Sequence, residues 1–215
     1  MDATHLPVTP RQFNRTMKHN GSEVLILSLL CPEFPQSGPT RRAERYFSHM
    51  VQQWQNRWET LLYPKACQAH SDCVKKQEPF EPWQAALHYK ITLWHPPIIS
   101  LQIDIQEQTS AFPRHVRIGE VWNMKTGYPC SLRQFLAVKP RRWKKEVIGS
   151  LCSQAQQRID SGESLLRPDC IPDLKQAFDP DRFYLTETGV ELYYPMYILG
   201  PFAEGIPTFT LPVLQ

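Results

Sequence analysis

Apolar and polar residues alternate with a period of two along the middle of the chain. The alternation runs through residues 86–94, resumes at 98–106 beyond a His-Pro-Pro turn, and returns at 115–123. This period is typical of β-strands with one buried and one hydrated face, and the short proline connection predicts an antiparallel hairpin. The continuous apolar run at 23–31 instead favours a central strand that is covered on both faces.

The last part of the chain alternates in the same way, around a loop of unusual composition. Residues 183–186 and 190–194 alternate on either side of a turn that ends in Gly189, where we expect a positive φ. The next segment, residues 195–205, is rich in aromatic residues, proline and glycine, so we expect it to be packed. Residues 206–214 predict a further strand. We expect this hairpin and its loop to organise the core.

The three- and four-residue apolar spacing of an amphipathic helix appears at residues 41–62. Thr40 is a good N-cap for this helix, and Pro64 is expected to end it. Its apolar stripe is rich in tryptophan, which suits either a ligand platform or core packing, and we favour core packing. The stripe consists of Ala43, Phe47, Met50, Trp54, Trp58 and Leu61.

A second long helix is predicted at residues 141–160, opened by Pro140 and ended by Gly162. Positive charge crowds its first turn, where cations oppose the helix dipole. A solvated basic face is the favoured interpretation, and a site for an anion or a partner's carboxylate is the alternative. The basic residues are Arg141, Arg142, Lys144 and Lys145.

Strands that follow one another through short turns, with two main helices between them, indicate the α+β class. We expect one antiparallel sheet that contains the three alternating stretches of the middle of the chain and residues 183–194. Both main helices are expected to pack on one face of that sheet.

The division of the chain into domains follows from the same patterns. Residues 1–21 are polar and unpatterned and predict an extended N-terminal arm. Residues 22–215 are expected to form the α+β domain, either as one body or as sub-regions of about 22–110 and 111–215.

Composition narrows the class of protein without indicating an activity. The 215 residues are 41% hydrophobic and carry a net charge of +3, which suits a globular core and is too weak a charge to indicate nucleic-acid binding. No signal peptide is visible, and the longest apolar run is too short to span a bilayer. We expect a cytoplasmic location if Met1 is the natural start, and an extracytoplasmic one if a preceding segment has been removed.

Motifs of the common enzyme classes are missing from the sequence. The glycines form no phosphate-binding pattern, and there is no G-x-S-x-G or H-E-x-x-H. We therefore predict no catalytic residue, no cofactor and no metal site, and expect the protein not to be an enzyme. The alternative is a small carbohydrate-active hydrolase that uses a pair of carboxylates, either Asp104 with Glu107 or Glu120 with Glu204.

The cysteines allow several interpretations. Six are present, an even number that is compatible with disulfides, although free thiols are more common in a chain of this length without a secretory signal. Cys67, His70 and Cys73 lie three residues apart in a stretch, residues 65–82, that is predicted to be a loop. A closed zinc site needs a fourth ligand, so we favour unpaired thiols over a local disulfide or a metal site.

Glu204 is the only charged residue of the aromatic stretch 195–205. A carboxylate buried there would be a candidate functional group. We favour a structural role, in which Glu204 accepts hydrogen bonds from backbone N–H groups of its own loop and pins it. In this hypothesis Tyr197 and Phe202 are buried.

Two stretches carry a resemblance to a known family. Residues 183–206, with Phe183-Tyr184-Leu185, Gly189, Tyr197 and the run Gly200-Pro201-Phe202-Ala203-Glu204-Gly205-Ile206, resemble the C-terminal signature of the bacterial RsiV-like domains. Residues 121–136, with Val121-Trp122-Asn123-Met124-Lys125-Thr126-Gly127 and Ser131-Leu132-Arg133-Gln134-Phe135-Leu136, resemble that family's strand, turn and short helix.

The resemblance implies a non-enzymatic binding or sensor module. Such a domain recognises lysozyme in an anti-sigma factor and also occurs as an accessory domain beside a peptidoglycan deacetylase, so the implied partner is a protein or a peptidoglycan-related ligand. This chain has Thr109-Ser110-Ala111-Phe112-Pro113-Arg114-His115 where many relatives have a glycine-rich loop.

Overall fold

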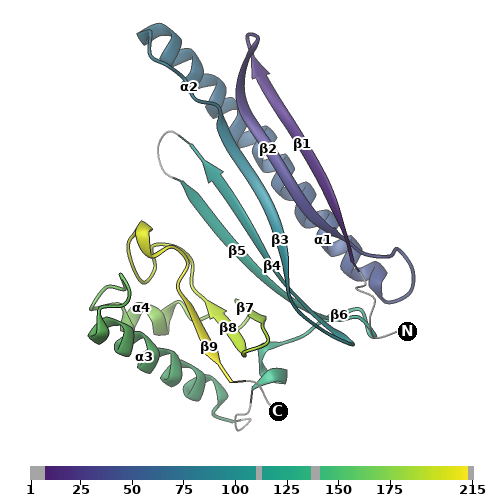
Figure 1. Cartoon of the computed structure of the whole chain (residues 1–215), viewed down its shortest axis with the longest axis vertical. Coiled ribbons are helices and arrows are strands. Elements are labelled where there is room, and N and C mark those ends of the chain that lie inside the picture. Colours follow the sequence, from purple (N-terminus) through teal and green to yellow (C-terminus); the bar gives the residue numbers. More distant parts are fainter. Residues whose placement is uncertain (1–7, 110–112, 137–140, 213–215) are drawn as a thin grey trace. The chain divides into compact units, whose positions relative to one another are not determined.

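The computed structural model describes residues 8–109, 113–136 and 141–212. The α+β class is confirmed, with a predominantly antiparallel arrangement of strands (Figure 1). The main helices are α1 (Thr40–Arg57), α2 (Tyr63–Lys76), α3 (Trp143–Ser161) and α4 (Ile171–Gln176). The strands are β1 (Thr9–His19), β2 (Ser22–Glu33), β3 (Trp83–His95), β4 (Ile98–Gln108), β5 (Arg114–Asn123), β6 (Tyr128–Pro129), β7 (Phe183–Leu185), β8 (Val190–Tyr193) and β9 (Thr208–Leu211).

The strands form two sheets. The first has the order β1-β2-β3-β4-β5-β6 and the second the order β7-β8-β9. Residues 183–194, which were expected in the same sheet as the middle strands, therefore belong to a separate one. The hydrogen bonds of the second sheet explain this, because β8 pairs on one edge with β7 and on the other with β9. Alternation predicts a strand but carries no information about which strand is its neighbour.

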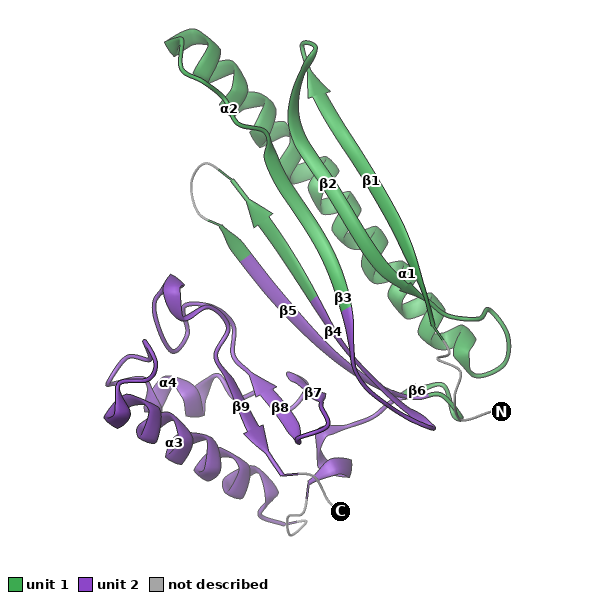
Figure 2. Ribbon diagram, viewed as in Figure 1, with its two compact units in different colours: residues 1–89, 104–114, 124–128 green, residues 90–103, 115–123, 129–215 purple. Residues whose placement is uncertain are grey.

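The chain divides into two compact units, each assembled from several segments (Figure 2). Unit 1 comprises residues 1–89, 104–114 and 124–128. Unit 2 comprises residues 90–103, 115–123 and 129–215. The two main helices fall in different units, α1 in contact with β2 and α3 in contact with β9, which corrects the expectation of two helices on one face of one sheet.

In unit 1 the N-terminal segment is a strand and not a free arm. β1 pairs antiparallel with β2 from Thr9 to His19, and β2 pairs on its other edge, in parallel, with β3. The expectation of a central strand at 23–31 is thus confirmed. β1 gives no hydrophobic signal because nearly all its side chains are exposed, and an edge strand can be held by main-chain hydrogen bonds alone.

The first helix of unit 1 continues past the proline that was expected to end it. Between α1 and α2 lies one turn of π-helix, η1 (Trp58–Leu62), and Pro64 sits at the start of α2, where its missing N–H does no harm. A π-turn adds a residue to the helix, so the apolar stripe shifts by one position. For this reason Leu62 is buried and Leu61 is 52% exposed, the reverse of the predicted stripe.

The start of α1 also differs from the prediction. The N-cap position is Pro39, and no side chain caps the helix. The Thr40 hydroxyl instead donates to the carbonyl oxygens of Pro35 and Ser37, each at 2.7 Å. Thr40 therefore closes the proline-rich turn before the helix and leaves the first helical N–H groups uncapped.

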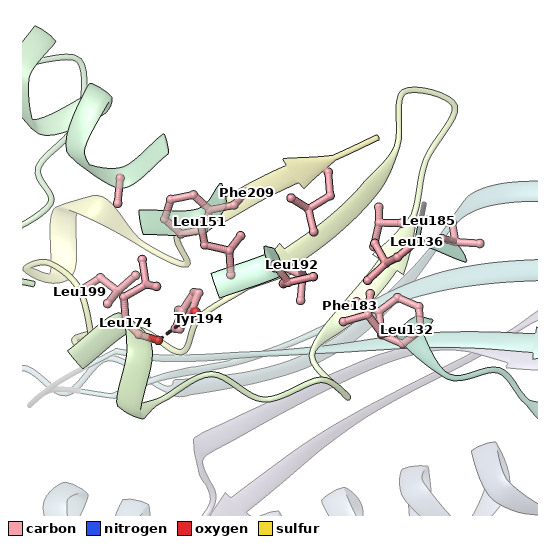
Figure 3. Packing of buried hydrophobic residues seen from close by; sticks show 14 of the residues in the cluster. Leu132, Leu136, Leu151, Leu174, Phe183, Leu185, Leu192, Tyr194, Leu199 and Phe209 are labelled. Atoms are coloured by element: carbon pink, nitrogen blue, oxygen red, sulfur yellow. Dashed lines mark hydrogen bonds between the residues drawn. The ribbon is translucent and has the colours of Figure 1, made fainter. Parts of the chain in front are cut away.

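The core of unit 2 is a continuous apolar cluster that joins the three-stranded sheet to its helices (Figure 3). Leu192 and Phe209 come from the sheet, Leu151 from α3 and Leu174 from α4. α3 ends as predicted at Gly162, which has φ +68°. Its predicted opening at Pro140 lies outside the described residues, and its first helical residue is Trp143.

Buried hydroxyl groups and close backbone contacts fix this core. Ser100 accepts from the Leu185 amide at 2.7 Å, Tyr193 accepts from the Gly119 amide at 2.8 Å, and Tyr194 donates to the Leu174 carbonyl at 3.0 Å (Figure 3). A Cβ at Gly119 would lie only 2.1 Å from the Phe183 carbonyl oxygen. Only glycine allows this approach.

Gly189 is needed because the backbone of β9 passes close to it. The sequence pattern had instead predicted a glycine here for its positive φ. Residues 186 and 189 close the predicted turn through reciprocal backbone hydrogen bonds, but Gly189 is not among the residues with positive φ. A Cβ at this position would lie 2.4 Å from the carbonyl oxygen of Leu211 on β9. The glycine therefore lets the third strand of the sheet come close to the hairpin.

Candidate functional site

Two aromatic side chains of residues 195–205, hereafter the aromatic loop, lie on the surface of unit 2. Tyr197 is 51% and Phe202 is 50% exposed, so the prediction that both are buried is wrong. Their ring centroids lie 6.3 Å apart with an interplanar angle of 31°. The loop buries Leu199 instead, which anchors it and leaves the two rings turned outward.

The exposed rings stand on a loop with fixed ends. The Glu204 carboxylate accepts the backbone N–H of Leu165 at 2.5 Å, and a Cβ at Gly200 would lie 2.8 Å from the Leu165 carbonyl oxygen. The structural role predicted for Glu204 therefore holds, but the donor lies in another segment and not in its own loop. The carboxylate and the missing side chain of Gly200 together seat the aromatic loop against residue 165.

Arg167 fastens the other part of the loop. Its backbone N–H donates to the Leu199 carbonyl at 2.8 Å, and its guanidinium donates to the Ile198 carbonyl at 3.0 Å and pairs with Asp173 of α4. Between these contacts Tyr197 adopts φ +69°. A non-glycine residue in this region is strained by about 1–2 kcal/mol, so the surrounding contacts hold Tyr197 in an unfavourable conformation with its ring outward.

A shallow depression adjoins the loop. It is lined by Arg167, Asp173, Gln176, Ala177, Tyr197 and Ile198. Leu165, which contacts the loop through its backbone, is itself 54% exposed. This surface offers aromatic and aliphatic contact area next to a paired arginine and aspartate, a combination typical of binding surfaces. It contains no nucleophile with an adjacent base.

The carboxylates proposed for a hydrolase have different surroundings. Asp104 and Glu107 are three residues apart on β4 and so point to opposite faces of a regular strand. Glu107 is buried and accepts the Trp58 indole N–H at 3.0 Å and the Arg57 Nε–H at 3.1 Å. Glu120 accepts the Trp122 indole N–H at 2.9 Å, whereas Glu204 is bound to Leu165.

The cysteine and histidine cluster lies on a helix, so the predicted loop at 65–82 is wrong for most of its length. Cys67, His70 and Cys73 are all in α2, and the His70 ring contacts His19 and Phe80. All six cysteines are free. Within residues 8–109, 113–136 and 141–212, no group of three or more histidine, cysteine, aspartate or glutamate residues is placed to hold a metal ion.

The tryptophan stripe of α1 and the basic residues at the start of α3 were the remaining candidates from the sequence. Trp58 is completely buried and Trp54 is half-buried, so the tryptophan stripe of α1 is largely core, as favoured. Arg141, Arg142, Lys144 and Lys145 are exposed around Trp143. The Lys144 ammonium lies 5.6 Å from the Trp143 ring centre, a contact that a solvated basic face also provides.

Burial raises the pKa of several other groups. The pKa of Cys31 rises to about 11 and that of Tyr193 to about 12, in each case because desolvation disfavours the charged form. Burial also raises the pKa values of Cys130, Cys170 and Tyr194. These shifts stabilise neutral thiols and phenols, so none of these groups is activated as a nucleophile.

The aromatic loop lies in the part of the chain that matches a family model. Residues 136–213 match the family model described as "Protein of unknown function (DUF3298)". The matched residues lie in unit 2 and include the aromatic loop and the three-stranded sheet. No curated protein matches the chain.

Two solved structures of DUF3298 proteins share the fold. The chain aligns with a member of the family from Bacteroides fragilis at a TM-score of 0.63 and 13% identity, covering 95% of this chain and 89% of the other. A DUF3298 protein from Pseudomonas aeruginosa aligns at a TM-score of 0.60 and 14% identity, covering 96% and 91%. The likeness extends over both units and concerns the fold alone.

Among the described residues, no helix combines the length and the apolar character needed to cross a bilayer.

Proposed function

We propose that this chain is a non-enzymatic binding module of the RsiV-like class and that the aromatic loop presents its binding surface. The expected partner is a protein or a peptidoglycan-related ligand. The observation that carries this proposal is the pair of half-exposed rings, Tyr197 and Phe202, on a loop whose backbone is held by Glu204 and Arg167.

The energetics of the loop favour recognition over a purely structural role. Complete burial of a large apolar side chain stabilises a protein by about 1.5–3 kcal/mol, and the two exposed rings give up a large part of that contribution. Tyr197 adds backbone strain. A loop that served only the core would turn these rings inward, whereas a preorganised loop with outward aromatic groups lowers the entropy cost of binding.

The type of residue on display also suits a partner surface. Tyrosine is enriched among the residues that contribute most to interfaces, and aromatic side chains in general are enriched at interface cores. Arg167 and Asp173 line the adjoining depression and can act as a polar rim. Glu107 is buried and hydrogen-bonded to Arg57 and Trp58, which disfavours a catalytic role for this carboxylate.

The resemblance to the RsiV-like family and the match to DUF3298 concern the same part of the chain. The stretch that resembles that family, residues 183–206, lies inside the DUF3298 match at residues 136–213. The aromatic loop forms the second half of the resembling stretch. The partner classes implied by the resemblance can therefore be tested on a defined surface.

The test uses two probes, insoluble peptidoglycan in a co-sedimentation assay and immobilised lysozyme in a surface-binding assay. We expect the wild-type chain to bind one of them, and the double variant Tyr197→Ala/Phe202→Ala to bind at least about tenfold more weakly, since loss of anchoring aromatic residues typically costs 2 kcal/mol or more. Phe13→Ala is the matched control, because Phe13 is 42% exposed on β1 in unit 1.

Three results would contradict the proposal. Release of soluble fragments from peptidoglycan by the wild-type chain would indicate an enzyme. Wild-type binding by the double variant would remove the aromatic loop from the site. Failure of the wild-type chain to bind either probe would contradict the partners that the resemblance implies, lysozyme and peptidoglycan.

A further inference from the structure

Two arginines converge on one buried carboxylate in unit 1, beside a half-buried tryptophan. The Arg57 Nε lies 3.1 Å from Glu107 Oε1, and an Arg114 Nη lies 3.6 Å from Glu107 Oε2. The Trp54 ring centre lies 5.9 Å from the Arg57 guanidinium and 5.7 Å from that of Arg114. We call Trp54, Arg57, Glu107 and Arg114 the double-arginine site.

The fold brings these residues together from three elements. Trp54 and Arg57 are in the last turn of α1, Glu107 is near the end of β4, and Arg114 opens β5. The next residue after Arg57, Trp58, begins the π-turn and donates its indole N–H to Glu107 at 3.0 Å. π-turns of this kind are retained where they direct a particular side chain, often at functional sites.

The carboxylate is already satisfied without Arg114. Oε1 of Glu107 accepts two hydrogen bonds, from Arg57 and Trp58, and the Glu107 side chain is 7% exposed. Arg114 is 47% exposed and its distance of 3.6 Å is too long for a hydrogen bond. Because Arg114 is half-exposed and makes no hydrogen bond at this distance, its ion pair with Glu107 is screened by solvent and contributes little to stability. Neutralisation of Glu107 therefore does not explain the second arginine.

The site consequently has a surplus of positive charge and of donors. Two guanidiniums face one carboxylate, and Arg57, 39% exposed, uses only its Nε–H in a hydrogen bond to the described residues. The other guanidinium N–H groups of Arg57 and Arg114 remain available at the surface to donate hydrogen bonds to a ligand. Like charges held close together are unfavourable, and an anion between them relieves the repulsion.

We propose that the double-arginine site binds an oxyanion, a carboxylate or a phosphate group, across the guanidiniums of Arg57 and Arg114. Guanidinium forks match both groups geometrically and bind them by charge-assisted hydrogen bonds. Both guanidiniums lie over the Trp54 ring, and this half-buried indole adds apolar contact area beside them for an anion attached to an apolar or aromatic body. This site lies in unit 1, outside the DUF3298 match, and is independent of the function proposed for the aromatic loop.

Titration of the labelled protein with inorganic phosphate and with benzoate, at constant ionic strength, tests this inference. In ¹H–¹⁵N spectra, we expect saturable shifts of the Arg57 and Arg114 Nε–H signals and of the Trp54 indole signal. Saturation by phosphate alone identifies a phosphate site, and saturation by benzoate alone or more tightly identifies a carboxylate site with an apolar body. In the second case Trp54→Leu should lower the affinity for benzoate. If phosphate also binds, its affinity should be unchanged in this variant.

Variants separate a built site from general ionic attraction. Arg114→Gln should weaken the anion at least about tenfold, because one charge-assisted contact is lost, while the fold is retained since Arg57 and Trp58 still satisfy Glu107. Arg15→Gln is the matched control, as Arg15 is 49% exposed in the same unit and paired with Glu59. Non-saturable shifts with both anions, or equal weakening in the two variants, would overturn the proposal.

Discussion

In unit 1 the buried polar side chains are carboxylates, whereas in unit 2 they are hydroxyl groups. Glu44 and Glu107 are each 6% exposed in unit 1, and Ser100 is completely buried in unit 2 together with the largely buried Tyr193 and Tyr194. Glu44 accepts the Phe34 amide at 2.7 Å and the Ser48 hydroxyl at 2.8 Å. Each unit thus uses a different chemistry for the same task of satisfying buried donors.

The difference between buried carboxylates and buried hydroxyl groups affects which charged side chains each unit requires. A buried carboxylate must be compensated by hydrogen bonds or by a cation. Glu44 is satisfied by neutral donors, whereas Glu107 is paired with Arg57, whose side chain is 39% exposed. A buried hydroxyl both donates and accepts without charge, so the interior of unit 2 needs no ions. Its described contact surface is the aromatic loop, where Tyr197 and Phe202 lie outward. The comparison predicts which substitutions and conditions disturb each unit.

The largest effect is expected in unit 2, from Gly119→Ala. The added Cβ would lie 2.1 Å from the Phe183 carbonyl oxygen, and because this atom belongs to the backbone, β5 and β7 must move apart. We expect a loss of about 3 kcal/mol or more, at the upper end of the usual cost of overpacking, measured by urea unfolding.

Gly149→Ala is the control for this substitution. Gly149 is exposed in the middle of α3, with nothing within 4 Å of the added Cβ. Alanine is a better helix former than glycine, so stability should rise by about 0.5–1 kcal/mol. If both alanine variants unfold at the same urea concentration, the close approach at Gly119 does not exist in solution.

The next largest effect tests the buried charge of unit 1. Glu107→Ala leaves the Trp58 indole and the Arg57 guanidinium without their acceptor, and we expect a loss of about 2–3 kcal/mol. Glu107→Gln keeps an oxygen that can accept from Trp58, so its loss should be smaller, about 1 kcal/mol. Equal losses in the two variants, measured by chemical unfolding, would show that packing and not hydrogen bonding explains the burial of Glu107.

The strands whose apolar and polar residues alternate could be predicted from the sequence. The edge strand β1 and the continuation of the first helix into α2 lack such a pattern and were missed. β3, β4, β5 and the hairpin of β7 and β8 were found because apolar and polar residues alternate along them in the sequence, although β7 buries all three of its side chains. β1 was missed because its pairing with β2 is a main-chain interaction at a sheet edge. The continuation into α2 was missed because Pro64 has the appearance of a stop, and a π-turn leaves no pattern that a single sequence reveals.

The aromatic loop was predicted to be anchored, but in a structural role and with its two rings buried. The composition of residues 195–205 correctly indicated an anchored loop, and Glu204 does accept a backbone N–H. The exposure of Tyr197 and Phe202 could not be inferred, because aromatic residues in a loop with a single charge are usually buried and the positive φ of Tyr197 has no signal in the sequence. The double-arginine site depends on residues 57, 107 and 114, whose proximity only the fold provides.

A moderate effect is expected from Tyr193→Phe in unit 2. Loss of the hydroxyl removes the acceptor of the Gly119 amide, and a buried N–H without a partner costs about 1–2 kcal/mol. Tyr197→Phe removes a hydroxyl from a tyrosine that is 51% exposed and should leave stability within about 0.5 kcal/mol of the wild type. Equal thermal midpoints for the two variants would mean that the Gly119 amide finds another partner.

The smallest effect is expected in unit 2 at alkaline pH. Burial raises the pKa of Tyr193 from its ordinary value of 10 to about 12, so above pH 10 the unfolded chain releases a proton that the folded protein keeps. The stabilisation is complete below pH 10 and is lost as the pH rises towards 12, with a loss of about 1 kcal/mol by pH 11.

Tyr193→Phe should therefore lose less stability than the wild type between pH 9 and 11 in urea unfolding. Tyr194, whose pKa burial also raises, is present in both proteins, so the difference between their slopes reports Tyr193 alone. Parallel slopes would contradict the burial of a neutral phenol at this position.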